Sequence, residues 1–213
     1  MVERIIYLSG RKMKRFPILS ADVFYKQNIG TPEQRAQLLK EAWDTHRSNP
    51  ESISFSNLGC WRSFFEYSDI SWLMAEIKDS INVAAGYYID ADPIYKTKTN
   101  SFLDAEIKYW TNINNPGSKN NLHEHKLHHY VAVYYVQGRD TGEIIFHNPI
   151  NLTEGCNPYA PFVSPISFKP NDGDLLVWPA WLPHETEPNK STRHRINIAF
   201  NIRFSCPQHI NYE

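Results

Sequence analysis

The chain has 213 residues, of which 41% are hydrophobic and 14% aromatic, and its formal net charge is −1. This length and composition predict one folded domain that needs no disulfide or structural metal, and they exclude a disordered chain. The balanced charge, without a basic arm, gives no support to a nucleic-acid surface. No apolar run approaches the roughly 20 residues that span a bilayer.

Two features predict a cytoplasmic protein. The first sixteen residues contain six charged side chains and lack the apolar stretch of a signal peptide. The three cysteines, Cys60, Cys156 and Cys206, stand far apart without CxxC spacing. An odd number at such spacing argues against a disulfide framework and against a thiolate zinc site. We therefore expect reduced cysteines that pack as small apolar residues.

The first part of the chain, about residues 1–95, predicts helices. Thr31 caps a helix start, a proline follows it in the first turn, and Gln34 completes a capping box. This helix should continue to about His46, and a second should begin near residues 68–69. Their apolar stripes are Ala36, Leu39, Ala42 and Trp43 in the first helix, and Leu73, Ile77, Ile81 and Ala84 in the second. We expect both stripes to cover the outside of a sheet.

The second part, about residues 100–205, consists of short alternating runs separated by turn-forming residues. The predicted strands are 102–113, 131–137, 143–146, 174–178 and 193–204, and the predicted turns are 115–117, 137–140 and 171–174. Many short strands with turns rich in Pro and Gly are typical of a jelly roll. The sequence predicts a mainly β (α+β) protein: a single domain, residues 1–213, with a double-stranded β-helix (jelly-roll) core and N-terminal helices outside it.

Four histidines fall within residues 123–129, at the start of a β-prone segment. If this chain is extended, His123 and His125 point to the same face and can converge on one metal, while Glu124 points the other way. A jelly roll can bring the loop that presents His184 beside them. Such a pair plus a distant histidine is the layout of a facial triad. The alternative is a set of solvated or hydrogen-bonded histidines. His128, His129, His147 and His194 are expected not to be ligands.

Arg195 opens a run that alternates strictly between apolar and polar residues. One face carries Ile196, Ile198, Phe200 and Ile202, and the other carries Arg195, Asn197, Ala199 and Asn201. The apolar face should pack under the helices, which aims the guanidinium into the barrel. A cation there is costly unless it meets an anion, and its planar fork suits a carboxylate. The alternative is an arginine that is exposed, or paired with Glu185 or Glu187.

Three segments carry a family resemblance that covers about residues 56–202. The first is the Gly-Cys-Trp-Arg-Ser part of 56–63, and the second is the His-x-His of 123–125 with the Ala-Val-Tyr-Tyr-Val of 132–136. The third is a C-terminal signature that begins with the Gly-Asp of 173–174 and ends with the Arg-Ile-x-Ile-x-Phe-Asn of 195–201. Between these ends it contains the Pro-x-Trp-x-x-His of 179–184 and the Glu-Pro-Asn of 187–189. Together they resemble the 2-oxoglutarate–Fe(II) oxygenases common in phage and marine bacterial genomes. That family is distantly related to the prolyl hydroxylases.

The resemblance implies a site and an activity. His123, His125 and His184 would bind Fe(II), and Arg195 would bind the distal carboxylate of 2-oxoglutarate. The activity implied is hydroxylation of a substrate C–H with O2, releasing succinate and carbon dioxide, in the cytoplasm of a bacterium or phage-infected host. The metal and co-substrate supply the oxidising chemistry, while the protein supplies binding and orientation.

Three further residues are assigned to the co-substrate by the same resemblance. Tyr135 resembles the tyrosine that assists the carboxylate contact in prolyl hydroxylases, and Asn112 and Asn197 are candidates for lining the same pocket. The chain also departs from the family. Lys126 replaces a proline after the second histidine. Most of the superfamily has Asp or Glu where His125 stands, so three neutral imidazoles leave the site one charge more positive.

Several alternatives stay open at this stage. The third ligand could instead be Glu106 or Asp104. The protein could be a three-histidine dioxygenase or metal hydrolase that does not use 2-oxoglutarate. It could also be a non-catalytic jelly roll with a structural or vestigial metal, which recognises sugar or protein through the tryptophans of residues 178–181. The prime substrate is not readable, and the C-terminal strand and tail could pair across a homodimer.

Overall fold

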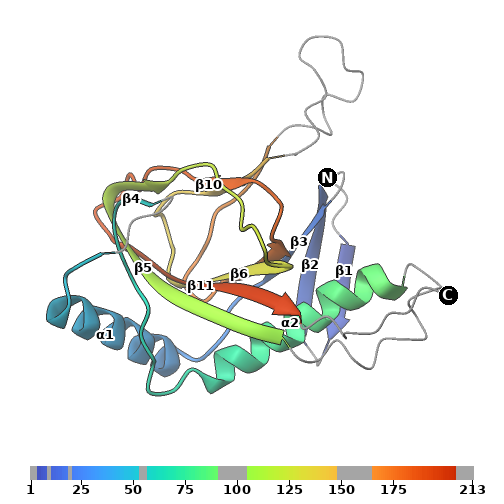
Figure 1. Cartoon of the computed structure of the whole chain (residues 1–213), viewed down its shortest axis with the longest axis horizontal. Helices are drawn as coiled ribbons and strands as arrows, with labels where there is room; N and C mark the ends of the chain where they lie inside the picture. Colours follow the sequence, from blue (N-terminus) through green and yellow to red (C-terminus); the bar gives the residue numbers. More distant parts are fainter. Residues whose placement is uncertain are drawn as a thin grey trace, which may run out of the picture.

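Two antiparallel sheets and two helices make up the described part of the chain (Figure 1). The computed structural model describes residues 4–8, 11–18, 21–52, 57–90, 105–147 and 165–204. The larger sheet has the order β1 (Arg4–Leu8), β2 (Arg11–Ile18), β3 (Ala21–Lys26), β9 (Leu175–Pro179), β6 (Tyr130–Gln137), β11 (Arg195–Phe204), β5 (Ala105–Asn120) and β4 (Asn57–Ser63). The smaller sheet has the order β10 (His184–Thr186), β7 (Ile144–Phe146) and β8 (Ile166–Phe168). The helices are α1 (Pro32–Ser48) and α2 (Ser71–Asp90).

Strand alternation in the larger sheet divides the buried side chains into two cores. The outer core lies against the helices and contains, from β6, β9 and β11, the residues Ala132, Tyr134, Val136, Leu175, Val177, Ile196, Ile198, Phe200 and Ile202. The inner core lies between the sheets and contains Val131, Tyr135, Leu176 and Trp178 with Ile144, Phe146 and Phe168 of the smaller sheet. Successive residues point to opposite faces, so each strand serves both cores. This arrangement confirms the predicted double-stranded β-helix with helices outside it.

The helices follow their sequence signals closely. The capping box of α1 forms, because the backbone N–H of Gln34 donates to Thr31 Oγ1 at 3.2 Å and that of Thr31 donates to Gln34 Oε1 at 2.8 Å. The whole predicted stripe of α2 is buried. In α1 the predicted Ala42 is buried and the predicted Leu39 and Trp43 pack partly buried against the core, whereas Ala36 is exposed and the buried Leu38 was not predicted. No helix in the described part of the chain is long and apolar enough to cross a membrane.

The prediction that the first part is helical was incomplete, since β1, β2 and β3 precede α1 and β4 separates the helices. Strand β3 lies inside the sheet, where Val23, Phe24 and Tyr25 are all buried and give no alternation to read. The predicted turn at 115–117 lies within β5. There the pairing of β5 with β4 shifts register opposite Gly59, which accommodates the extra residues as a bulge.

The capping box allows a test of the helix start. Replacing Thr31 with Ala removes the side-chain acceptor for an otherwise unbonded N–H, and should lower the free energy of unfolding by about 1 kcal/mol. Urea denaturation measures this change. The matched control is Thr45→Ala in the same helix, whose hydroxyl bonds only to the Glu41 carbonyl at 2.9 Å. Alanine favours a helix interior, so the control should stay within about 0.5 kcal/mol. Equal losses in both variants would contradict the capping role.

Candidate active site

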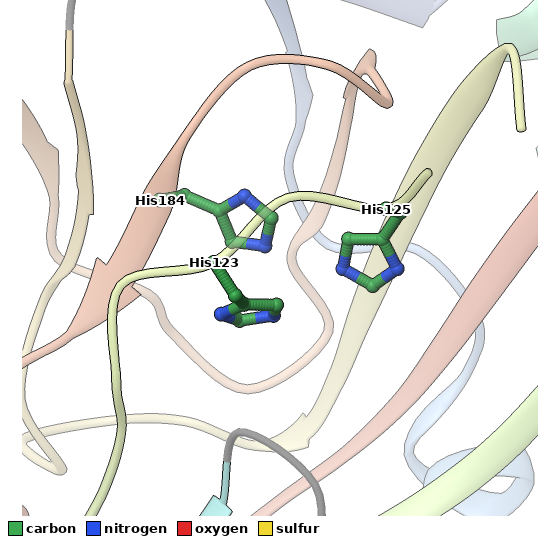
Figure 2. Close-up of side chains that lie close together, drawn as sticks. All are labelled: His123, His125 and His184. Carbon is green, nitrogen blue, oxygen red and sulfur yellow. The ribbon is translucent and has the colours of Figure 1, made fainter. Parts of the chain in front are cut away.

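Three histidines from two distant segments meet between the sheets (Figure 2). His123 and His125 belong to the chain between β5 and β6, and His184 is the first residue of β10. Each offers a ligand atom, and these atoms lie within 4.8 Å of one another. Backbone hydrogen bonds hold the segments together: the N–H of His123 and of His184 each donate to the other's carbonyl at 3.0 Å. The N–H of His125 donates to Ala180 O at 2.9 Å.

The ring orientations suit metal binding through one particular nitrogen. His123 Nδ1 lies 2.6 Å from Asn121 O, and His184 Nδ1 lies 2.9 Å from Leu182 O. His125 Nδ1 lies 2.7 Å from the side-chain oxygen of Asn201. An oxygen acceptor at Nδ1 fixes the ring proton there, which leaves the Nε2 lone pair for a metal. All three imidazoles therefore share one tautomer, set by their hydrogen-bond partners.

Burial keeps the three rings neutral, the form that a metal ligand requires. It lowers the pKa of His125 to about 3, with the neighbouring His123 adding to the effect. Burial also holds the pKa of His184 well below its usual value, and it lowers the pKa of His123. The cluster is thus ready to bind a cation without first losing protons at neutral pH.

A row of polar side chains crosses three strands of the larger sheet beside the histidines. Tyr135 on β6 pairs with Asn197 on β11, which pairs with Asn112 on β5. Directly paired residues point to the same face, here toward the cavity. Asn112 Nδ2 donates to Asn197 Oδ1 at 2.8 Å. Burial raises the pKa of Tyr135 to about 12, against the opposing charge of Arg195. All three predicted pocket residues and the three histidines line one cavity of about 730 Å³.

Arg195 is 1% exposed, so the alternative of an exposed arginine is wrong. Its Nη1 donates to Thr141 O at 2.9 Å and to Glu187 O at 3.3 Å, and its Nη2 donates to Thr186 Oγ1 at 2.8 Å. These acceptors are neutral, and within the described residues no carboxylate lies within ion-pair distance of the guanidinium. Thr186 lines the cavity. A cation held this way is stabilised if an anion enters beside it.

The remaining sequence candidates lie outside the cluster. Glu106 is exposed and pairs with Lys108 at 2.9 Å, which removes it as a third ligand, and Asp104 lies outside the described residues. His128, His129, His147 and His194 do not join the cluster. Cys60 is half-buried and forms no disulfide with another described residue, and Cys156 and Cys206 lie outside the described residues. The partner of His125, Asn201, was placed on the correct face of β11 by alternation but was not assigned a role.

Fold and site together define a double-stranded β-helix with a candidate metal centre. Residues 108–201 match the family described as "Putative 2OG-Fe(II) oxygenase". This range contains the three histidines, the polar row and Arg195, and over it the resemblance predicted from the sequence is confirmed. Fe(II) and 2-oxoglutarate are the cofactor and co-substrate that the family description states. The segment 56–63 lies outside the match.

Solved structures share the fold at low sequence identity. A prolyl-4-hydroxylase from Pseudomonas putida is similar with a TM-score of 0.61 and 14% identity, over 86% of this chain and 93% of that one. The epimerase SnoN from nogalamycin biosynthesis gives 0.58 and 11%, over 85% and 76%. A prolyl hydroxylase from Trichoplax adhaerens gives 0.54 and 12%, over 85% and 83%. No curated protein matches the sequence.

The contact between Asn201 and His125 can be tested through metal affinity. In Asn201→Leu the imidazole loses the acceptor that fixes its tautomer, so Fe(II) or Zn(II) affinity should fall by about 10–100-fold. Calorimetric titration of the metal measures this. Asn115→Leu, at an exposed position on the same sheet, is the control. Unchanged affinity in Asn201→Leu would show that the hydrogen bond does not prepare the ligand.

Depressed histidine pKa values predict a pH-dependent stability for the metal-free protein. Below about pH 6.5 the unfolded chain takes up protons on the three imidazoles that the folded chain does not. The free energy of unfolding should therefore fall as pH drops from about 6.5, by up to about 1.4 kcal/mol per pH unit for each imidazole. Urea denaturation at several pH values measures the slope, and His125→Gln should flatten it. A slope unchanged in that variant would contradict this origin.

Proposed function

We propose that the protein is an Fe(II)- and 2-oxoglutarate-dependent hydroxylase that acts on a C–H bond and releases succinate and carbon dioxide. The observation that carries the proposal is the meeting of three neutral imidazoles of one tautomer with a polar row around one cavity, where a buried guanidinium donates to Thr186 of the cavity wall. The family match supports it. One structure of SnoN holds Fe3+ and α-ketoglutarate, which shows that this fold accommodates the pair in a relative.

The chain's own groups have separable tasks in this proposal. His123, His125 and His184 would hold the iron through Nε2, the nitrogen that their Nδ1 hydrogen bonds leave available. Bound iron and 2-oxoglutarate supply the activation of O2 and the oxidising power. Arg195 binds the distal carboxylate, and a rotation of Thr186 Oγ1 away from Nη2 frees a donor for it. Tyr135 donates a hydrogen bond from its phenolic O–H to the same carboxylate, because its raised pKa keeps the phenol protonated.

The cavity wall also positions and shields the reacting groups. Asn112 and Asn197 bond to each other, so each keeps one side of its amide fixed while the rest of the amide faces the cavity. Ala199 and Val133, one row further along the same strands, give the wall a small apolar patch. Apolar groups next to the metal exclude water from the bond that is attacked.

The two alternative functions are less well supported by the side chains. A dioxygenase that does not use 2-oxoglutarate gives no role to a buried cation whose described partners are all neutral oxygens. A binding module that uses the tryptophans of residues 178–181 needs both rings at the surface. Trp178 is fully buried between the sheets, and Trp181 alone is exposed.

The direct test is the visible charge-transfer band that forms when 2-oxoglutarate chelates Fe(II). We expect the band when both are added to the protein without oxygen. Arg195→Ala should weaken 2-oxoglutarate binding by roughly 30-fold or more, because truncating one member of a buried charge pair costs about 2–5 kcal/mol. Its Fe(II) affinity should remain. His184→Ala should instead lose Fe(II) binding.

Arg203→Ala is the matched control for Arg195→Ala, because Arg203 is exposed on the same strand and should not affect either affinity. Absence of the band at saturating concentrations would end the proposal in its chelating form. Equal losses of iron and 2-oxoglutarate affinity in Arg195→Ala would remove the role assigned to the guanidinium.

A further inference from the structure

A second arginine, Arg62 on β4, lines the cavity itself, whereas Arg195 lies behind the wall and donates to Thr186 of that wall. Its guanidinium carbon lies 4.2 Å from the ring centroid of Trp110 and 5.5 Å from that of Phe64. A guanidinium over an indole face gains cation–π attraction and loses much of its freedom. The two rings therefore hold a positive charge at a defined position in the cavity.

The same stack connects this cation to the metal cluster. Trp110 is stacked on His125, with ring centroids 6.0 Å apart and planes 21° apart. His125 is in turn stacked on His184, at 5.2 Å and 9°. The positive charge of Arg62 contributes to lowering the pKa of both His123 and His125, so it lies within electrostatic reach of the ligands.

Strand order separates Arg62 from Arg195, the residue proposed to bind the distal carboxylate of 2-oxoglutarate. Arg62 pairs with Asn112, so it continues the row formed by Tyr135, Asn197 and Asn112. Strand β4, however, ends the strand order of the larger sheet, and β5 lies between it and β11. With roughly 4.8 Å between neighbouring strands, the backbones at Arg62 and Asn197 are about 10 Å apart. Arg195 on β11 and Arg62 on β4 can therefore serve two different ligands.

Arg62 places a positive charge in the wall of the cavity that the proposed iron and 2-oxoglutarate would share. Three neutral imidazoles leave the two charges of Fe(II) to be balanced by the two of 2-oxoglutarate. Glu124, a carboxylate in the same lining, lies 3.6 Å from Lys126 Nζ. Burial lowers the pKa of Arg62 to about 10, which still leaves it protonated at neutral pH.

We propose that Arg62, held over Trp110, is the anion-recognition residue of the prime-substrate site, and that the prime substrate carries a carboxylate or a phosphate. This inference rests on the proposed function and adds a substrate class to it. Carboxylate and phosphate both offer the paired oxygens that a planar guanidinium fork binds through two hydrogen bonds. The anionic group anchors the substrate at the β4 side of the cavity and directs the rest of the molecule toward the histidines.

Binding of small probes tests this without knowledge of the substrate. The protein is loaded with Fe(II) and saturating 2-oxoglutarate without oxygen, so that the Arg195 site is filled. Acetate, methyl phosphate and neutral acetamide are then titrated by calorimetry. We expect at least one anion to bind and acetamide not to bind. Arg62→Gln should weaken the anion by about tenfold or more, as for loss of a charge-assisted hydrogen bond. Whichever anion binds more tightly to the wild type identifies the group.

Three comparisons keep the test decisive. Arg139→Gln removes the same charge at an exposed position and should leave anion affinity unchanged. Arg62→Lys keeps the charge without the planar fork, so its affinity should be intermediate. This variant decides the question if thermal unfolding shows that Arg62→Gln is not folded. Affinity for 2-oxoglutarate should stay within about twofold of wild type in Arg62→Gln, since the carboxylate-binding fork of Arg195 is untouched.

The outcomes separate this inference from the proposed function. Anion affinity that is unchanged in Arg62→Gln, or lost equally in Arg139→Gln, overturns the role of Arg62 while leaving 2-oxoglutarate binding intact. Failure of the wild-type protein to bind 2-oxoglutarate overturns the proposed function instead. In that case the same titration of the metal-free protein still measures whether Arg62 binds anions.

Discussion

The period of two along β11 is the constraint on which the rest of the structure depends. This strand lies between β6 and β5 inside the larger sheet, so its side chains face both cores. Ile198 and Phe200 anchor the helices, while Asn197 and Asn201 face the cavity. A shift of one residue would exchange the two sets, and would place a guanidinium under the helices and isoleucines in the cavity. The register of β11 therefore determines both the packing of the core and the placement of the site.

Neutrality of the ligand set is the second organising feature. Each imidazole donates a hydrogen bond from its Nδ1–H to a neutral oxygen. Two of these oxygens are backbone carbonyls and the third is the side-chain amide oxygen of Asn201. A carboxylate at any of these positions would make the rings more basic and the cavity less positive. Imidazole ligands suit iron, zinc, copper and nickel alike. Three imidazoles alone therefore do not select iron over these other metals.

Sequence reasoning could reach the parts of the protein that local chemistry encodes. The capping box at Thr31, the stripe of α2 and the alternation of β11 each follow from spacing alone, and the structure confirms them. The convergence of His184 with His123 followed from the expected jelly roll, and the resemblance supported it, because no local pattern says which loops meet. Strand β3 was missed since a strand buried on both faces has no alternation to detect.

Other features were invisible because they depend on cross-strand register. Arg62 and Trp110 are 48 positions apart in the sequence, and only the pairing of β4 with β5 brings them together. The role of Asn201 likewise depends on a ring in the β5–β6 connection. Residues of this kind carry no signal in a single sequence, since an arginine on an edge strand and an asparagine in a strand have many ordinary uses.

The reciprocal backbone bonds between His123 and His184 have a consequence for how such a site can change over time. They join two ligand-bearing segments through main-chain atoms, which every amino acid except proline supplies in full. The scaffold around the cluster therefore does not depend on which side chains stand at these positions. Ligand identity can drift, for example between imidazole and carboxylate, while the loops keep their places. Substitutions of the metal ligands can therefore change the metal or the reaction while these backbone hydrogen bonds still hold the two segments together.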